Sequence, residues 1–207
     1  MIHTLSDLMP EAELAALRDR YGDFPVLTHR VKMGPDSLKD YRAQLKRRRG
    51  EILLVLARPT GEVLMHTKRF YPQGVYRLPT GGIDWNEPVP DAWQRELWEE
   101  TQLKCSSERL LGVIGYEFVG YSAACGTADE GIESVPFVSF VFQQANVVGD
   151  PIPLDESEQI SDFQWQSRAD LKIAAAHLSG LDRIGSDKGD WGRFRAVAHE
   201  FVHDANW

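Results

Sequence analysis

Three glutamates near the middle of the chain have the residue type and spacing of a cation-binding group. Glu96, Glu99 and Glu100 stand at positions i, i+3 and i+4 of an expected helix, so their carboxylates project from one face. Like charges this close repel each other unless cations lie among them. Clustered hard oxygen ligands suit Mg²⁺ or Mn²⁺. The trio therefore predicts a divalent metal site.

The segment from Leu78 to Leu103 indicates how these carboxylates are positioned. It opens with a strand-to-loop pattern in which Gly81 and Gly82 let the backbone turn sharply and approach a ligand. Pro90 and Asp91 then mark the start of a helix made of strong helix formers without internal Gly or Pro. We expect a glycine-rich loop that leads directly into the carboxylate-bearing helix.

A longer pattern joins these residues. Its matching positions, in order, are Gly81, Glu87, Arg95, Glu96, Leu97, Glu99, Glu100 and Leu103, with five residues before Glu87 and seven before Arg95. This pattern resembles the signature box of the Nudix hydrolases. One position departs from it, because Gln102 stands where the family usually has glycine. We expect Gln102 to end the helix in a left-handed conformation, at a cost of about 1 kcal/mol.

The resemblance implies a metal-dependent pyrophosphohydrolase that cuts the diphosphate of a nucleoside diphosphate linked to another group. The cation would be Mg²⁺, with Mn²⁺ as an alternative. Its ligands would be Glu96, Glu99, Glu100 and the backbone carbonyl of Thr80, and the residues that hold the loop and helix in place would be Gly81, Glu87 and Arg95. In some family members a later glutamate acts as the catalytic base. Here we favour Glu158, with Glu156, Glu130 and Glu133 as alternatives.

The substrate indicated by the resemblance is a small nucleotide, with ADP-ribose or a nucleotide sugar favoured. The LPTGGID sequence and the extra N-terminal strand and helix are similar to the ADP-ribose pyrophosphatase branch. Two positions count against this, because Val119 replaces a proline often found in that branch and Tyr121 hints at dinucleoside polyphosphate hydrolases. One or two aromatic residues should contact the nucleobase, from the set Phe70, Tyr71, Tyr76, Trp85, Tyr116 and Tyr121.

Two alternatives belong to other functional classes. The segment from His199 to His203 reads HEFVH, which matches the zinc-protease motif HExxH, although only four residues follow it. A C-terminal helix with surface or half-buried histidines accounts for the same pattern. The second alternative is a non-catalytic Nudix fold that senses a ligand or binds a protein. The intact glutamate trio favours the enzyme, because a pure sensor need not keep three repelling carboxylates.

Composition narrows the classes of partner. A net charge of -8 and a pI of about 5.3 argue against a sequence-independent grip on nucleic acid or an anionic membrane. The basic run at 46–49 is interpreted as a solvated face. The two cysteines, Cys105 and Cys125, form no CxxC pair, and no apolar run is long enough for a membrane span. We expect a cytoplasmic protein and, by analogy with similar hydrolases, a homodimer.

The expected fold is α+β, a Nudix-like α/β/α sandwich with a mixed central sheet. Residues 1–207 should form a single domain, with 1–48 as an N-terminal elaboration and 49–207 as the Nudix core with C-terminal helices. A basic helix or loop is expected at 35–48, and a hairpin joins 51–57 to 63–69 through a tight turn. Periodicity predicts helices at 10–21, 170–177 and 191–203 and strands at 24–33, 110–119, 135–143 and 160–166.

Overall fold

The computed structural model describes residues 3–103, 108–120, 134–153, 158–185 and 187–207. Six residues named above lie outside these ranges: Cys105, Tyr121, Cys125, Glu130, Glu133 and Glu156. The elements in chain order are α1 (Leu5–Leu8), α2 (Glu11–Tyr21), β1 (Val26–Met33), α3 (Pro35–Gln44), β2 (Arg48–Leu56), β3 (Val63–Lys68), β4 (Thr80–Asp84), α4 (Val89–Thr101), β5 (Glu108–Gly120), β6 (Val135–Gln144), β7 (Ile160–Gln166), α5 (Asp170–Ser179), the short 3-10 helix η2 (Leu181–Ile184) and α6 (Gly189–Asp204).

The main sheet has five strands in the order β1-β5-β6-β2-β4. Strand β1 runs parallel to β5 and β2 runs parallel to β6, whereas the β5–β6 and β2–β4 pairs are antiparallel. The mixed sheet expected from the sequence is therefore confirmed. Strands β2 and β6 are buried along almost their whole length, because helices cover the sheet on both faces.

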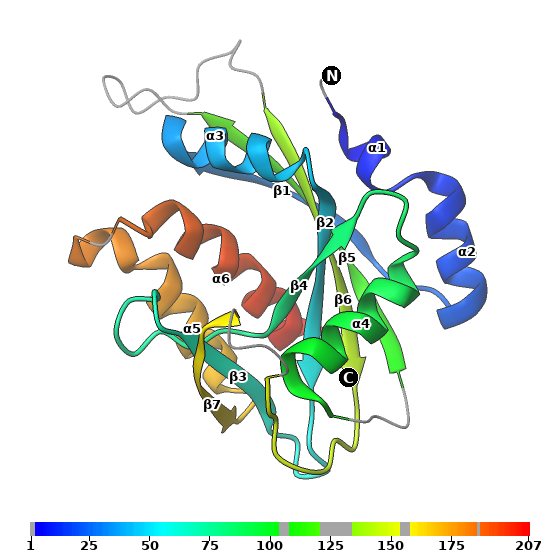
Figure 1. Ribbon diagram of the computed structural model, residues 1–207, viewed down its shortest axis with the longest axis vertical. Helices are drawn as coiled ribbons and strands as arrows, with labels where there is room; N and C mark the ends of the chain where they lie inside the picture. Colours follow the sequence, from blue (N-terminus) through cyan, green and yellow to red (C-terminus); the bar gives the residue numbers. More distant parts are fainter. Residues whose placement is uncertain (1–2, 104–107, 121–133, 154–157, 186) are drawn as a thin grey trace.

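The two helical layers can be followed in Figure 1, with α1, α2 and α4 on one side of the sheet and α3 and α6 on the other. On the first face, Trp93 of α4 stacks on Phe142. On the opposite face, Tyr41 of α3 and Phe194 of α6 pack against Phe118. Helix α5 packs against α6. The aromatic core thus fixes the α/β/α sandwich, and α4 and α6 approach the sheet from opposite sides.

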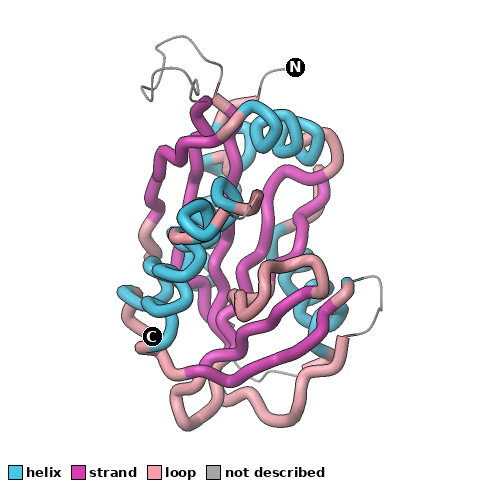
Figure 2. The backbone as a smooth tube through the Cα atoms, turned by 90° about the vertical axis from the view of Figure 1, so that its left-hand side faces the viewer, coloured by secondary structure: helices cyan, strands magenta, loops and turns pink. Residues whose placement is uncertain are grey.

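The expected hairpin between residues 51–57 and 63–69 is wrong. Strand β2 pairs with β4 along one edge and with β6 along the other, so no edge remains for β3. Strand β3 lies outside the main sheet and pairs antiparallel with β7. Figure 2 shows these two strands as a separate ribbon at the bottom of the view. Only the bridge between Ala57 and Val63 joins the two segments. The tight turn itself is present, with Gly61 at φ 87° and its N–H bonded to the carbonyl of Arg58.

The interpretation of residues 46–49 as a solvated face is also wrong for its second half. Arg48 is half-buried, and Arg49 is only 7% exposed. The guanidinium of Arg49 makes a two-point ion pair with Glu13 at 2.7 and 2.8 Å and donates to the carbonyls of Leu8 and Glu87. Because these partners belong to the N-terminal helices and to the loop before α4, Arg49 connects the two regions.

The other predicted helices and strands are present, with ends shifted by a few residues. Helix α1, the short strand β4 and η2 were not predicted. Within the described part of the chain, no helix is both long and apolar enough to cross a membrane.

Candidate active site

Helix α4 carries two of the three glutamates into the protein and leaves the third near the surface. Trp93 and Leu97 lie on the apolar stripe that packs against the sheet. Because Glu96 and Glu100 adjoin this stripe, they are only 8% and 1% exposed. Glu99 points outward, with 43% of its side chain exposed. The three carboxylates therefore differ in burial, with Glu100 the most buried and Glu99 the most exposed. It ends, as predicted, at a left-handed Gln102, φ 53°.

The glycine pair of β4 brings the backbone against two charged side chains. A Cβ atom at Gly81 would lie 1.8 Å from both the carboxyl carbon and Oε2 of Glu96, so a larger residue there would displace that carboxylate. At Gly82, a Cβ would lie 2.9 Å from Cδ of Arg48. The close approach that the sequence predicted for these glycines is present, and it places Glu96 and Arg48 beside consecutive residues of one strand.

Arg95 connects the loop to the helix. Its guanidinium pairs with both carboxylate oxygens of Glu87 at 2.9 Å and donates to the carbonyl of Gly82 at 2.9 Å. The remaining nitrogen, Nη1, contacts Glu96 at 2.7 Å and Glu99 at 3.0 Å. Hydrogen bonds from Arg95 lower the pKa of Glu87 below its usual value. One cation thus holds three carboxylates and fixes the loop to α4.

Glu100 lies in the deepest part of the site. Its Oε1 is 3.5 Å from Nζ of Lys68, which also contacts Oε2 of Glu158 at 2.6 Å. Its Oε2 has no hydrogen-bond partner in the described part of the chain and lies 3.9 Å from Nδ1 of the fully buried His66. Burial raises the pKa of the Glu100 carboxyl to about 7 and lowers that of His66 well below its usual range.

These oxygen atoms are suited to a hard divalent cation, although in the described residues no three acidic, histidine or cysteine side chains already surround a common point. Glu100 Oε2 is buried without a hydrogen bond, which is a costly state for a carboxylate oxygen. Arg95 contacts one oxygen of Glu96 and one of Glu99, and Lys68 contacts the other oxygen of Glu100. These carboxylate oxygens fit Mg²⁺ or Mn²⁺. A bound metal ion would compete with the two cationic side chains for the same oxygens.

A cavity of about 710 Å³ opens beside this group. It brings together most of the residues that the sequence singled out, namely Thr80, Gly81, Arg95, Glu96, Glu99, Glu100 and Glu158. Glu87 lies behind Arg95 instead of lining the cavity. Of the predicted aromatic set, Phe70 and Tyr71 line it. The others that can be described do not: Tyr76 donates to Asp162, Trp85 donates to the carbonyl of Leu45, and Tyr116 is buried in the core.

Sequence reasoning missed five other residues that line the cavity. These are Arg48, Lys68, Arg77, Trp191 and Arg195. One signal was available, because Trp191, Arg195 and His199 stand four residues apart and so share one face of α6. A stripe that mixes aromatic, cationic and imidazole side chains is unusual for a face that packs on a sheet. Its first two members, Trp191 and Arg195, line the cavity.

The HEFVH segment has a structural role. His199 is buried, and its Nε2 accepts a hydrogen bond from the backbone N–H of Leu78 at 3.1 Å while Nδ1–H donates to the carbonyl of Arg195 at 2.8 Å. Burial lowers the pKa of His199 to about 4. His203 contacts Asp204 at 2.7 Å. Because both ring nitrogens of His199 are engaged, this histidine cannot bind zinc as it stands, and it anchors α6 to the start of the box.

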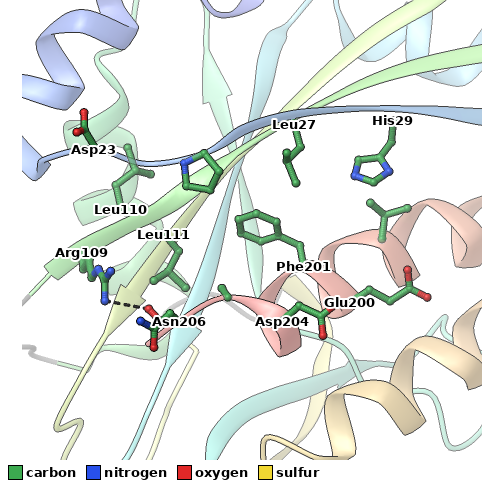
Figure 3. A pocket seen from close by; sticks show the side chains of 13 residues that line it. Asp23, Leu27, His29, Arg109, Leu110, Leu111, Glu200, Phe201, Asp204 and Asn206 are labelled. Atoms are coloured by element: carbon green, nitrogen blue, oxygen red, sulfur yellow. Dashed lines mark hydrogen bonds between the residues drawn. The ribbon is translucent and has the colours of Figure 1, made fainter.

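A second cavity, of about 460 Å³, lies between β1, β5 and α6 (Figure 3). Leu27 and Phe201 face each other across it, and Glu200 and Asp204 lie along its rim. None of the box residues lines this cavity. The candidate active site is therefore the larger cavity beside α4.

The chain matches the NUDIX domain family over residues 47–184, which is 138 of its 207 residues. It belongs to the Nudix family. The match includes the whole box and the cavity-lining residues between positions 47 and 158. As a Nudix-type hydrolase, it acts on phosphoric anhydride bonds. No curated protein sequence matches the chain significantly.

Solved structures with the same fold are distant in sequence. A MutT NUDIX hydrolase from Burkholderia pseudomallei shares 24% identity, covering 59% of this chain and 84% of its own, with a TM-score of 0.43. The NUDIX domain of Shewanella oneidensis NrtR, in complex with ADP ribose, shares 20% identity over 58% of this chain and 73% of its own, with a TM-score of 0.42. The E. coli dihydroneopterin triphosphate pyrophosphohydrolase shares 22%, over 63% and 86%, with a TM-score of 0.41.

Proposed function

We propose that this Nudix protein is a divalent-metal-dependent pyrophosphohydrolase that cleaves the diphosphate of a nucleoside diphosphate linked to another group. The first candidates are ADP-ribose and nucleotide sugars. The observation that carries the proposal is the pair of inward-facing carboxylates beside the glycine strand, where Glu96 lies against Gly81 and Glu100 has a buried oxygen without a hydrogen bond. Keeping such groups ionised is costly, and a bound cation offsets that cost.

The cation would be held by Glu96, Glu99 and Glu100 together with the backbone carbonyl of Thr80. When bound, it neutralises charge on the diphosphate oxygens and lowers the pKa of the attacking water. The Glu87–Arg95 pair keeps α4 in register with β4, because the same guanidinium bonds the Gly82 carbonyl at 2.9 Å. Gly81 supplies the space that Glu96 occupies.

Glu158 is our candidate for the catalytic base. It lies in the same cavity as the box carboxylates, although it comes from the segment before β7. Lys68 contacts both Glu158 and Glu100, at 2.6 and 3.5 Å, so it reduces the repulsion between the two carboxylates. In this scheme, Glu158 accepts the proton of the water that attacks phosphorus, and Lys68 orients the receiving carboxylate.

The nucleobase would lie on the aromatic wall. Phe70 is 53% exposed although it is a large apolar side chain, and its ring packs edge-on against Tyr71 at 5.0 Å. Tyr71 in turn packs against Trp191, with centroids 4.8 Å apart. An exposed aromatic surface supported by two further rings is suited to stacking a base. Phe70 and Tyr71 are therefore our candidates for the one or two aromatic residues expected to contact the base.

The test is product analysis with a panel of ADP-ribose, nucleotide sugars, dinucleoside polyphosphates, NADH, coenzyme A and nucleoside triphosphates, with Mg²⁺ or Mn²⁺. We expect a nucleoside monophosphate among the products by mass spectrometry. In Glu99→Gln and Glu100→Gln, turnover should fall by about 10³-fold or more while circular dichroism stays unchanged. Full turnover in both variants would refute the assigned metal site.

A further inference from the structure

The cavity beside α4 also contains three arginines that lie within electrostatic reach of one common side chain, Tyr41. Arg48, at the start of β2, Arg77, between β3 and β4, and Arg195, on α6, all line the cavity. Tyr41 lines the cavity as well. We call these three arginines the arginine cluster.

The cluster carries positive charge that its direct partners only partly compensate. Arg195 pairs with Glu51 at 2.7 and 2.8 Å, and its buried Nε has no hydrogen-bond partner in the part of the chain that the structure describes. Arg77 donates to neutral oxygens of Tyr71, Leu78 and Thr80.

Arg48 donates to the amide oxygen of Gln44. Within the described ranges, neither Arg48 nor Arg77 has a carboxylate within ion-pair distance. The three guanidinium groups carry three positive charges and their one paired carboxylate, Glu51, carries one negative charge, so the net formal charge of this group is +2.

The other cations of the cavity are compensated differently. Lys68 contacts Glu100 and Glu158, and Arg95 contacts Glu87, Glu96 and Glu99. The cavity therefore has an acidic part, suited to a metal-bound diphosphate, and a cationic part. Arg48 and Arg77 lie within electrostatic reach of Glu96 and Glu100, respectively, but form no direct ion pair with them. Strand β4 adjoins both parts, because Thr80 accepts from Arg77, Gly81 lies against Glu96 and Gly82 lies against Arg48.

Burial makes the arginine cluster a better anion site. Arg77 and Arg195 are 4% and 7% exposed, so water screens their charges weakly. A guanidinium in such a place binds phosphate or carboxylate through charge-assisted hydrogen bonds, which are stronger than those between neutral groups. The buried Nε–H of Arg195 is a further donor that has no hydrogen-bond partner among the described residues.

We propose that the arginine cluster binds an anionic group of the substrate other than the diphosphate that is cleaved. The preferred substrate is then a nucleoside diphosphate whose linked group carries a phosphate or a carboxylate. This inference rests on the proposed function for its substrate class, but the anion site itself can be measured without turnover. The observation that carries it is that Arg48 and Arg77 line the cavity beside Gly82 and Thr80 of β4 and form no ion pair within the described ranges.

The test compares matched substrates that differ by one anionic group. UDP-glucose and UDP-glucuronate differ by a carboxylate, and ADP-ribose and ADP-ribose 1″-phosphate differ by a phosphate. The variant is Arg48→Gln, which removes a charge without breaking an ion pair between described residues. The control is Lys46→Gln, a nearby exposed cation outside the cavity. The double variant Glu51→Gln/Arg195→Gln removes the Arg195 donor while leaving no unpaired buried carboxylate.

We expect wild-type kcat/KM to be higher for the charged member of at least one pair, and the responding pair identifies phosphate or carboxylate. Arg48→Gln should lower this preference about tenfold, as the loss of one charge-assisted hydrogen bond predicts, and Lys46→Gln should leave it unchanged. An equal loss on both members of each pair, or no wild-type preference in either pair, would overturn the inference.

A second measurement separates the arginine cluster from catalysis. Calorimetric titration of inorganic phosphate into the metal-free protein, with EDTA present, should show binding that weakens about tenfold in Arg48→Gln. If this binding is observed while no nucleotide is cleaved, the anion site stands and the proposed hydrolysis fails. If phosphate does not bind to the wild type, the arginine cluster is not an anion site.

Discussion

Replacement of Glu100 by glutamine should stabilise the metal-free protein. The carboxylate is 1% exposed, and burial raises its pKa from 4.5 to about 7. A shift of about 2.5 units, at 1.36 kcal/mol per unit, corresponds to about 3 kcal/mol of destabilisation at pH 8. This shift is already net of the attraction of Lys68, which lowers the pKa of Glu100. The expected gain at pH 8 is therefore about 3 kcal/mol.

The effect of Glu100 on the free energy of unfolding should depend on pH. Because the folded protein binds the Glu100 proton more tightly than the unfolded chain does, wild-type stability should fall as the pH rises from 4.5 through 7. The advantage of Glu100→Gln should therefore be largest at pH 8 and should shrink by about 2 kcal/mol at pH 5, where the native carboxyl is already protonated. The same variant should be inactive. The Glu100 carboxylate would thus lower the stability of the metal-free protein and also be required for activity.

Urea denaturation in EDTA at pH 5 and pH 8 measures both effects. Glu99→Gln is the matched control, because its side chain is 43% exposed and its loss should change stability by less than about 1 kcal/mol at either pH. A Glu100→Gln protein that is no more stable than wild type at pH 8, or whose gain is equal at both pH values, would contradict the reasoning from burial.

Further predictions concern the surroundings of the site. Gly81→Ala should reduce kcat by at least about tenfold with little change in the circular dichroism spectrum, because the new Cβ would lie 1.8 Å from the Glu96 carboxyl group. Arg195→Gln should lower the free energy of unfolding by about 3 kcal/mol, since it leaves Glu51 buried without its guanidinium, and adding Glu51→Gln should recover most of that loss in urea titrations. Burial lowers the pKa of His199 in the folded protein to about 4, so this histidine is protonated in the unfolded chain before it is protonated in the folded protein. Between pH 6.5 and 4 the wild type should therefore lose about 3 kcal/mol of stability. In His199→Gln this loss should be smaller. An unchanged acid transition in that variant would exclude His199 as the cause.

The acidic part of the site was predictable from the sequence because its information is local. Glu96, Glu99 and Glu100 share a helical face by spacing alone, and Gly81 precedes them at a fixed distance along the chain. The left-handed Gln102 also followed from the pattern, as the observed φ of 53° shows. Such features depend on backbone geometry over a few residues, which periodicity captures directly.

The cationic part was not predictable because it is assembled from segments far apart in the chain. Arg48, Arg77 and Arg195 come from three separate segments. Arg48 and Arg77 resemble ordinary surface residues when only their neighbours are considered, and the spacing around Arg195 does not indicate what the helix face contacts. The hairpin failed for the same reason: the turn at Gly61 was correct, but local signals cannot tell that β4 and β6 take both edges of β2. Pairing partners are set by competition within the whole sheet, which a short stretch of sequence does not encode.

The ion pair between Arg49 and Glu13 has a consequence for how a protein like this one can change over evolutionary time. The N-terminal helices are bonded through Arg49 to the carbonyl of Glu87, the residue that pairs with Arg95. Loss of residues 1–25 would leave a buried guanidinium without its carboxylate, one residue from Arg48 in the cavity. We therefore propose that residues 1–48 and 49–207 are inherited as one unit: exchanging the first segment for an unrelated one would demand a compensating change at position 49, so substitutions at positions 13 and 49 should be correlated among relatives.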